Sequence, residues 1–382
     1  MEILHGSNNR NSKRQNSIGH TSNNSSRNNN FTIIRMIATA FVFIGHMGMI
    51  QSGTPLLFGS YSLHELGVGI LFLISGYLIT KSWLSDPHPL RYAIRRFFRL
   101  WPPFAVMILV MVFLTGPLLS DLGIQGYFAS TYTTYLRNLR FFIVYAQPGV
   151  FSNNLLANTT NGSLWTMPVE AAAYVLTPIL VTVLCVQHGT NRSRTNYSFY
   201  AAALLTAAAV AFDLYLRVFQ ADALVVFYGT DLIAAWHLIT MYIIGTFFTY
   251  EQARKYLNLQ VACVAVCALL IFQSSSVFLQ YLTLYLILPY FIFSFAFAPK
   301  AKFSKIGRKL EPSYGIYLYG FFFEQLVVSL QQIFGVNFTY IQALILSVIP
   351  TLIAAVLSYY LVEVPSQRLS KKLLKRLVKK EK

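Results

Sequence analysis

Long apolar stretches, separated by short polar segments, follow one another along nearly the whole chain. Most of them have the roughly 20 residues that a helix needs to cross the hydrocarbon core of a bilayer. We therefore predict an all-α fold, a polytopic transmembrane bundle of about ten helices, with nine or eleven also possible. The predicted spans are residues 31–50, 66–83, 101–119, 166–186, 198–217, 231–249, 259–273, 277–298, 313–333 and 340–362. The span 259–273 is the weakest, because it is short and has polar ends.

The positions of lysine and arginine predict the orientation of this bundle. With the N-terminus inside, 26 of the 30 Lys and Arg residues fall in the segments that would face the cytoplasm. Cytoplasmic loops of membrane proteins carry such an excess of positive charge. The four exceptions are Arg35, Arg137, Arg140 and Arg217. We therefore expect both termini to be cytoplasmic.

Composition supports the same class of protein. Of the 382 residues, 55% are hydrophobic and only 11% are charged, against about 25% charged residues in soluble domains. A net charge of +17 would suit nucleic acid, but the positive residues are dispersed over short loops beside apolar helices. We expect membrane lipids and a phosphorylated cofactor as partners, and no nucleic acid.

The two ends of the chain differ from the apolar part between them. Residues 1–30 are rich in Asn, Ser and Arg and contain no apolar run, so they indicate a disordered cytoplasmic tail and not a signal peptide. Residues 31–365 form the predicted transmembrane domain. Residues 366–382 form a basic cytoplasmic tail.

Three cysteines, Cys185, Cys263 and Cys267, lie in or at the ends of predicted spans. Their spacing does not match a zinc site, so we expect neither a disulfide framework nor a metal. Cys263 and Cys267 are one helical turn apart, which is more typical of small-residue packing than of chemistry.

Arg35 and His46 lie in one apolar stretch, with ten residues between them. On a helix this spacing puts both side chains on nearly the same face, roughly 16 Å apart along the axis. Ionisable residues inside a membrane segment usually serve a function, since arginine pairs with phosphates and histidine exchanges protons near neutral pH. The alternative is an arginine that reaches the membrane surface and a histidine that is only packed in the bundle.

Glu170 is the predicted partner of His46. Counting residues from the predicted span ends places both side chains some 7–8 Å below the outer surface. A carboxylate at that level orients an imidazole that acts as a general base on a hydroxyl. His237 is another candidate base at a similar depth. Three further acidic residues compete for either partner: Asp213, Asp231 and Glu324.

A cluster of arginines precedes the third span in the segment RYAIRRFFRLWPPF. On a helix, Arg95, Arg96 and Arg99 form a group of forked donors suited to phosphate. Anchoring to lipid headgroups is the alternative, and taken alone the run favours it.

Two other segments are rich in particular residue types, one in aromatic residues and one in glycine. The loop 120–164 is rich in aromatic residues, which suit anchoring at the outer interface and also stack on sugar rings. The second span contains Gly67, Gly69 and Gly76, which allow neighbouring helices to approach closely.

These segments, in this order, resemble the acyltransferase-3 family of integral membrane acyltransferases over nearly all of residues 31–370. Arg35 and His46 resemble its Arg-X10-His signature, and ILFLISGYLI resembles its Phe-x-x-Ser-Gly-Phe/Tyr-Leu run. RRFFRLWP resembles the Arg-Arg-x-x-Arg-x-x-Pro motif, GSLWTMPVE the Ser-Leu-Trp-x-x-x-x-Glu element that ends at Glu170, and EVPSQR the closing Glu-x-Pro-x-x-Arg. Gly320 stands where many relatives carry a second histidine.

The resemblance implies an O-acetyltransferase of the plasma (inner) membrane. Its donor would be acetyl-CoA or another acyl-CoA from the cytoplasm, and its acceptor a hydroxyl of an extracytoplasmic or lipid-linked glycan, such as capsule, exopolysaccharide or lipopolysaccharide. Arg95, Arg96 and Arg99 would then hold the nucleotide phosphates, and Arg35 would guide the donor. His46, oriented by Glu170, would deprotonate the acceptor or be acylated transiently.

The alternative function is a proton-coupled transporter or flippase of a glycan or lipid. Arg35, His46 and Glu170 would then form its proton relay and substrate site. The chain shows no inverted repeats of the kind found in many transporters, which counts against this alternative.

Overall fold

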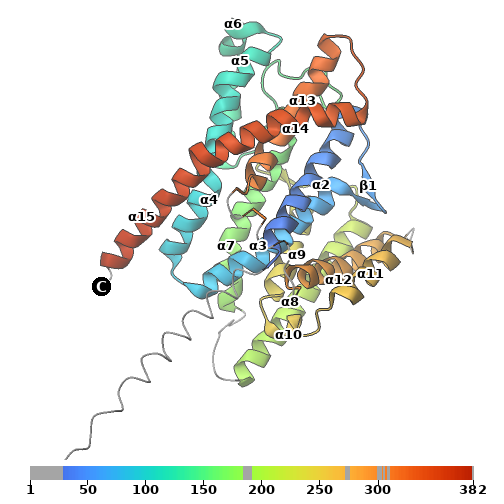
Figure 1. Cartoon of the computed structure of the whole chain (residues 1–382), viewed down its shortest axis with the longest axis vertical. Coiled ribbons are helices and arrows are strands. Elements are labelled where there is room, and N and C mark those ends of the chain that lie inside the picture. The colour runs from blue at the N-terminus through green and yellow to red at the C-terminus, as the bar shows by residue number, and fades with distance from the viewer. Residues whose placement is uncertain are drawn as a thin grey trace, which may run out of the picture.

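The computed structural model describes residues 29–183, 192–271, 276–298, 303, 306–307 and 310–380. These residues form a mostly helical bundle with two very short β-hairpins (Figure 1). The predicted helical class is therefore confirmed, while the hairpins were not foreseen from the hydrophobic pattern.

A helix lies at each of the ten predicted spans. They are α2 (Phe31–Ser52), α3 (Leu63–Ser85), α4 (Pro89–Val110), α7 (Thr166–Val183), α8 (Arg192–Phe219), α9 (Leu232–Phe247), α11 (Leu259–Ile271), α12 (Val277–Ala296), α13 (Ser313–Ile333) and α14 (Tyr340–Ser358). Within the described residues, seven helical segments are long and apolar enough to cross a membrane. Helices α9 and α11 are shorter, and α13, which carries a glutamate and three glutamines, is not among the seven. The count of ten spans and the cytoplasmic termini stay predictions.

Shorter elements connect these helices. They are β1 (Leu57–Phe58), β2 (Tyr61–Ser62), η1 (Met111–Thr115), α5 (Gly116–Leu119), α6 (Gly123–Ala129), η2 (Tyr132–Arg140), η3 (Gly162–Trp165), β3 (Val226–Phe227), β4 (Thr230–Asp231), α10 (Glu251–Arg254), η4 (Tyr359–Glu363) and α15 (Val364–Lys380). Strand β1 pairs with β2, and β3 with β4, both antiparallel. Phe58 of the first hairpin stacks on Phe41 of α2, with ring centroids 6.4 Å apart, and the hairpin leads directly into α3.

Helix α3 lies at the centre of the bundle, packed against α2, α7 and α9. Its contact with α9 is backbone to backbone: a Cβ added at Gly76 would lie 2.0 Å from the carbonyl oxygen of Tyr242, and one at Gly245 would lie 1.9 Å from that of Leu73. The predicted role of glycine in close helix approach is confirmed at Gly76. At Gly69 an added Cβ would meet only ordinary contacts, at 3.7 Å.

The chain segment before α7 enters the interior of the bundle. The amide nitrogen of Asn161 donates to the carbonyl oxygen of Leu318 at 2.8 Å, and the hydroxyls of Thr166 and Tyr317 share a hydrogen bond of 2.6 Å. Leu318 and Tyr317 lie near the beginning of α13, far from its other end at Ile333. Helix α7 therefore begins inside the protein and not at its outer surface.

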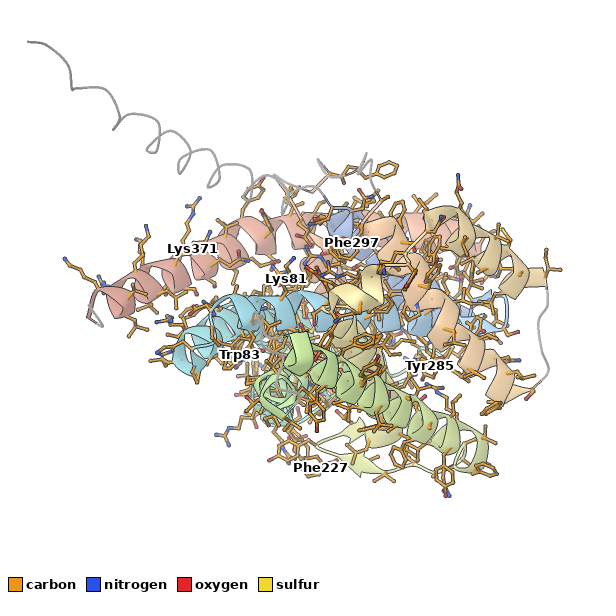
Figure 2. All side chains as sticks on the ribbon, turned by 90° about the horizontal axis from the view of Figure 1, so that it is seen from below. Lys81, Trp83, Phe227, Tyr285, Phe297 and Lys371 are labelled. Atoms are coloured by element: carbon orange, nitrogen blue, oxygen red, sulfur yellow. The ribbon has the colours of Figure 1, made fainter. Side chains whose placement is uncertain are left out.

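The C-terminal part is one continuous helical run through α14, η4 and α15, which lies beside α4 (Figure 1). The predicted boundary between residues 365 and 366 falls inside α15, so the helix continues into the basic segment. Lys371 is exposed on α15, whereas Tyr285 of α12 is buried within the bundle (Figure 2).

Most of the predicted N-terminal tail, residues 1–28, lies outside the described residues. Asn30, at its end, is buried and donates from its side chain to the carbonyl oxygen of Phe295 at 2.9 Å. Cys263 and Cys267 are free and exposed, and Cys185 lies outside the described residues. Among the described residues, His, Cys, Asp and Glu form no group of three or more that could hold a metal ion.

Candidate active site

A cavity lies among α2, α3, α4, α7 and α13 and holds about 1090 Å³ of space, open solvent at its mouth included. Three arginines and one carboxylate line it: Arg35 from α2, Arg96 and Arg99 from α4, and Glu170 from α7. We call it the arginine cavity. The structure thus brings together four of the predicted site residues, which are separated by up to 135 positions in the sequence.

Two of these arginines are held by carboxylates from the C-terminal part of the chain. Arg35 lies 2.8 Å from a carboxylate oxygen of Glu311, and Arg99 lies 3.5 Å from one of Glu363. Glu363, from the closing motif, is buried, so its charge depends on Arg99 for compensation. The pair joins the closing motif of the sequence to α4.

Arg96 is held differently. Its guanidinium lies over the rings of Tyr92 and Tyr174, at 5.6 and 5.8 Å from their centroids, and it donates to the Ser82 hydroxyl at 3.3 Å. Within the described part of the chain it forms no ion pair with a carboxylate. Of the three cavity arginines it is therefore the one whose forked donors are least engaged by negative charge.

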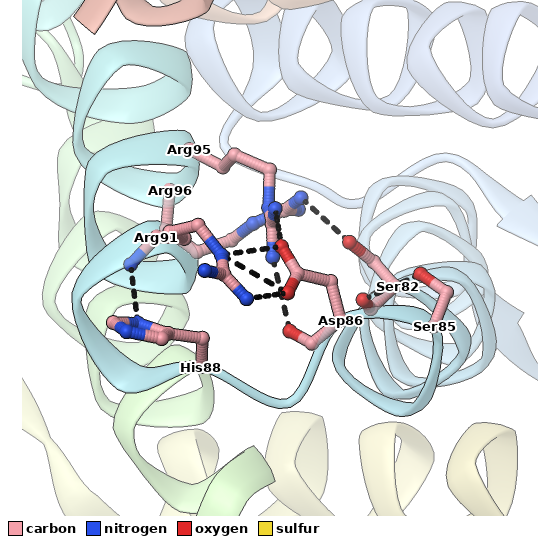
Figure 3. Close-up of polar contacts among 7 residues, drawn as sticks. All are labelled: Ser82, Ser85, Asp86, His88, Arg91, Arg95 and Arg96. Carbon is pink, nitrogen blue, oxygen red and sulfur yellow. Dashed lines mark hydrogen bonds and ion pairs between the residues drawn. The ribbon is translucent and has the colours of Figure 1, made fainter. Parts of the chain in front are cut away.

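Arg95, which the sequence groups with Arg96 and Arg99, does not line the cavity. It lies 2.6 Å from a carboxylate oxygen of Asp86, which also binds Arg91 at 2.6 Å (Figure 3). Hydrogen bonds from Arg91 and Arg95 lower the pKa of Asp86 to about 2. This ion cluster ties the turn before α4 to the first two turns of that helix.

Glu170 accepts a hydrogen bond of 2.5 Å from the Tyr174 hydroxyl, one turn along α7. The charges of Arg99 and Arg96 act on it across the cavity. The carboxylate therefore offsets part of the positive charge and fixes the Tyr174 ring under Arg96.

His46 does not line the arginine cavity. Thr39 is the last residue of α2 in the cavity lining, and His46 lies about 10 Å further along the helix. The His46 ring instead contacts Phe321 of α13, with centroids 5.2 Å apart, and His64 of α3, at 5.3 Å.

The structure does not bring His46 and Glu170 together, since no contact joins them among the described residues. The prediction of equal depth assumed that α7 begins at the outer surface. Because α7 begins inside the bundle, Glu170 lies at the level of the arginines and not at that of His46. Their catalytic roles stay predictions.

His64 was missed as a site residue. It is the second residue of α3, and a histidine near a helix end is by default a solvated one. The sequence contained no signal for its contact with His46, because the hairpin that orients α3 against α2 is only two residues per strand.

His237 and Asp213, named as alternatives, form a separate buried cluster. Asp213 lies 3.5 Å from Nδ1 of His237 and accepts hydrogen bonds from Tyr285 and, at 2.9 Å, from Arg217. His237 Nδ1 and the Tyr285 hydroxyl are 2.6 Å apart. The two alternative site residues, His237 and Asp213, therefore pair with each other.

The other two acidic alternatives have different surroundings. Asp231 caps α9 by accepting from the backbone amides of Ile233 and Ala234 at 3.0 and 3.4 Å. Glu324 is fully buried in α13, and its carboxylate oxygens have no hydrogen-bond partner among the described residues.

Gly320 stands where many relatives of the resembled family carry a second histidine. At Gly320 an added Cβ would lie 2.8 Å from the Phe43 ring, so a histidine does not fit there without a shift of that ring.

The chain is similar to known acyltransferases over most of its length. Residues 28–360 match a family described as acyltransferase domain. The chain is 24% identical over 343 residues to a protein of Shigella phage Sf6 named O-acetyl transferase, which covers 88% of this chain and 95% of that protein. It is 31% identical over 169 residues to Nodulation protein 10 of Rhizobium leguminosarum bv. viciae, 42% of this chain and 46% of the relative.

No solved structure matches the chain significantly. The family match nevertheless covers most of the chain, including α2 with Arg35 and His46, α4 with its arginines and α7 with Glu170. The chain is mostly helical and has several apolar helices, and it matches this family over most of its length. It is therefore a membrane acyltransferase, and it belongs to the acyltransferase domain family.

Proposed function

We propose that this protein transfers an acetyl group from cytoplasmic acetyl-CoA to a hydroxyl of an extracytoplasmic or lipid-linked glycan. The observation that carries the proposal is the arginine cavity. It is lined by Arg35 of α2, by Arg96 and Arg99 of α4 and by the carboxylate of Glu170 of α7. The name of the phage relative, O-acetyl transferase, supports the acetyl group.

The cavity suits the phosphates of an acyl-CoA. Arginine binds phosphate through two parallel hydrogen bonds, and Arg96 has forked donors that no carboxylate engages among the described residues. Arg35 and Arg99 would exchange Glu311 and Glu363 for phosphate oxygens on binding. Of the predicted donor-binding residues, Arg95 has a supporting role, since it holds Asp86 outside the cavity.

The spacing within α2 fits the length of the donor. The phosphates would lie near Arg35, and the acyl thioester would extend roughly 16 Å along α2 towards His46. His46 takes the proton of the acceptor hydroxyl, whose oxygen forms a bond to the acyl carbon while the carbon–sulfur bond breaks. Glu170, with Tyr174, would hold the arginines in position, which replaces the orienting role first expected of it.

The orientation follows from the distribution of lysine and arginine. It puts the arginine cavity on the cytoplasmic side, where acyl-CoA is available, and His46 near the outer side, where a glycan is presented. We accordingly assign the protein to the plasma (inner) membrane.

Two experiments test the proposal. Mass spectrometry of surface glycans from cells with and without the gene should show an acetyl group that depends on the gene, and His46→Ala should remove it. Retained acetylation in that variant would contradict the role of His46.

The second experiment measures ligand binding by thermal unfolding. Purified protein should be thermally stabilised by acetyl-CoA but not by free glycan, whereas a glycan transporter would show the opposite.

A further inference from the structure

The contact between His46 and His64 depends on an unusually close approach of α2 and α3. A Cβ added at Gly45 would lie 2.5 Å from the backbone nitrogen of His64. Likewise, one at Gly67 would lie 2.5 Å from the carbonyl oxygen of Ala38. The absence of side chains at these two positions lets the imidazole rings lie 5.3 Å apart between centroids.

His64 connects this contact to a polar crevice. Its Nδ1 shares a hydrogen bond of 2.9 Å with the hydroxyl of Ser62, the residue that precedes α3. Ser62 lines a crevice of about 290 Å³, open solvent included, together with Glu65 and His237. Glu65 is exposed, so proton-exchanging groups reach from His46 to the protein surface.

We propose that His64 accepts the proton from His46 and passes it through Ser62 and the crevice to water at the outer surface. This inference rests on the proposed function, in which His46 deprotonates an acceptor hydroxyl. The ester oxygen–carbon bond forms as the thioester carbon–sulfur bond breaks. The acceptor proton then leaves outward through His46 and His64, while the departing thiolate takes a proton from water on the cytoplasmic side.

The contacts of the His46 ring favour His64 as the acceptor of this proton. Phe321 lies 5.2 Å from the His46 ring between centroids, and His64 lies 5.3 Å from it. Of these two neighbours, only His64 exchanges protons. A base that must release its proton in each turnover therefore has a neighbouring acceptor on the outer side.

The groups that act on His64 are few. Among the described residues, the titratable groups that act on it are Glu65, on its own helix, and His46, on α2. His237, on α9, faces the same crevice but is paired with Asp213 and Tyr285. Glu65 thus supplies the negative charge nearest to the exit.

The test uses right-side-out membrane vesicles loaded with labelled acetyl-CoA, and it measures acetyl transfer to membrane-associated glycan over a range of external pH. His64→Gln should lower the rate roughly 100-fold or more, a loss typical of proton-transfer groups, and change the pH dependence. Imidazole added outside should restore much of the rate. Thr54→Ala, an exposed hydroxyl deletion at the same end of the protein, should leave the rate unchanged.

Other outcomes separate the two proposals. A His64→Gln rate equal to wild type, with His46→Ala inactive, would overturn the proton route and leave the proposed function standing. A reduced rate that imidazole does not restore, in His64→Gln and in His64→Asn, would also overturn it and assign His64 a structural role. Full activity of His46→Ala, or no transfer from acetyl-CoA by the wild type, would instead overturn the proposed function.

Discussion

Arg99 and Glu363 lie 264 positions apart in the sequence, yet Nη1 of the arginine is 3.5 Å from Oε2 of the glutamate. The glutamate side chain is 1% exposed and the arginine 32%. The pair therefore joins the C-terminal helical run to α4 at the wall of the arginine cavity. Before any donor binds, Glu363 therefore compensates the positive charge of Arg99.

Glu363→Gln should make the protein less stable without donor and more responsive to it. Removing the carboxylate leaves Arg99 without its ion pair, at a cost of about 1–3 kcal/mol. Phosphates bound in the cavity would replace the lost partner, so acetyl-CoA should raise the melting temperature of the variant more than that of the wild type. Thermal unfolding with and without acetyl-CoA measures both effects, and an equal shift in the two proteins would argue against phosphate at Arg99.

Arg95 and Arg96 are adjacent in the sequence and should differ sharply on substitution. Arg96 lines the cavity, and losing a charge-assisted phosphate contact costs about 1.5–3 kcal/mol, so Arg96→Ala should weaken acetyl-CoA binding roughly 10- to 100-fold. Arg95→Ala should leave donor affinity nearly unchanged, because Arg95 binds Asp86. Titration of purified protein with acetyl-CoA compares them directly, and similar losses in both would contradict the assignment of Arg95.

Helix positions were predictable from the sequence because a span of about 20 apolar residues is a strong signal. The observed helices begin and end within a few residues of the predicted limits in most cases, as for α2 and α13. The two hairpins were not predictable, since each strand has only two residues and no alternating pattern forms over that length. Helix α15 was missed because its charged residues conceal an amphipathic continuation of α14.

The site was predictable only in part, for a geometric reason. Residues on one helix keep their spacing, so Arg35 and His46 both lie on α2, as the sequence predicted, and Arg96 and Arg99 of α4 both line the arginine cavity. The distances between residues on different helices depend on the depth in the protein at which each helix begins. The buried hydrogen bond of Asn161 to Leu318 moves the start of α7 inward, and no local sequence signal reveals it.

The packing of α3 against α9 predicts a contrast between two glycines of the same helix. Gly76→Ala would place a Cβ 2.0 Å from the Tyr242 carbonyl oxygen, while Gly69→Ala would meet side-chain atoms of Met241 at 3.7 Å. Overpacking of this kind costs roughly 1–3 kcal/mol or more. Gly76→Ala should therefore lower the melting temperature and the yield of folded protein, and Gly69→Ala should be tolerated. Equal stability of the two variants would show that α3 and α9 are further apart.

The ion cluster at Asp86 predicts a pH dependence of stability. Its pKa is about 2 in the folded protein, against an ordinary value of 3.8, because Arg91 and Arg95 donate to it. A carboxylate with a lowered pKa stabilises the fold fully above its ordinary pKa, and the contribution disappears as pH falls through the folded value. The difference in melting temperature between wild type and Asp86→Asn should thus be constant above about pH 4 and vanish near pH 2.

Asp222→Asn supplies the matched control, since Asp222 is exposed and forms no ion pair among the described residues. Its melting temperature should follow that of the wild type at every pH. If Asp86→Asn also followed the wild type down from neutral pH, the two arginines would not be held by Asp86 in solution. Arg95 would then be free to turn towards the cavity, and the phosphate role that the sequence first suggested for it would regain support.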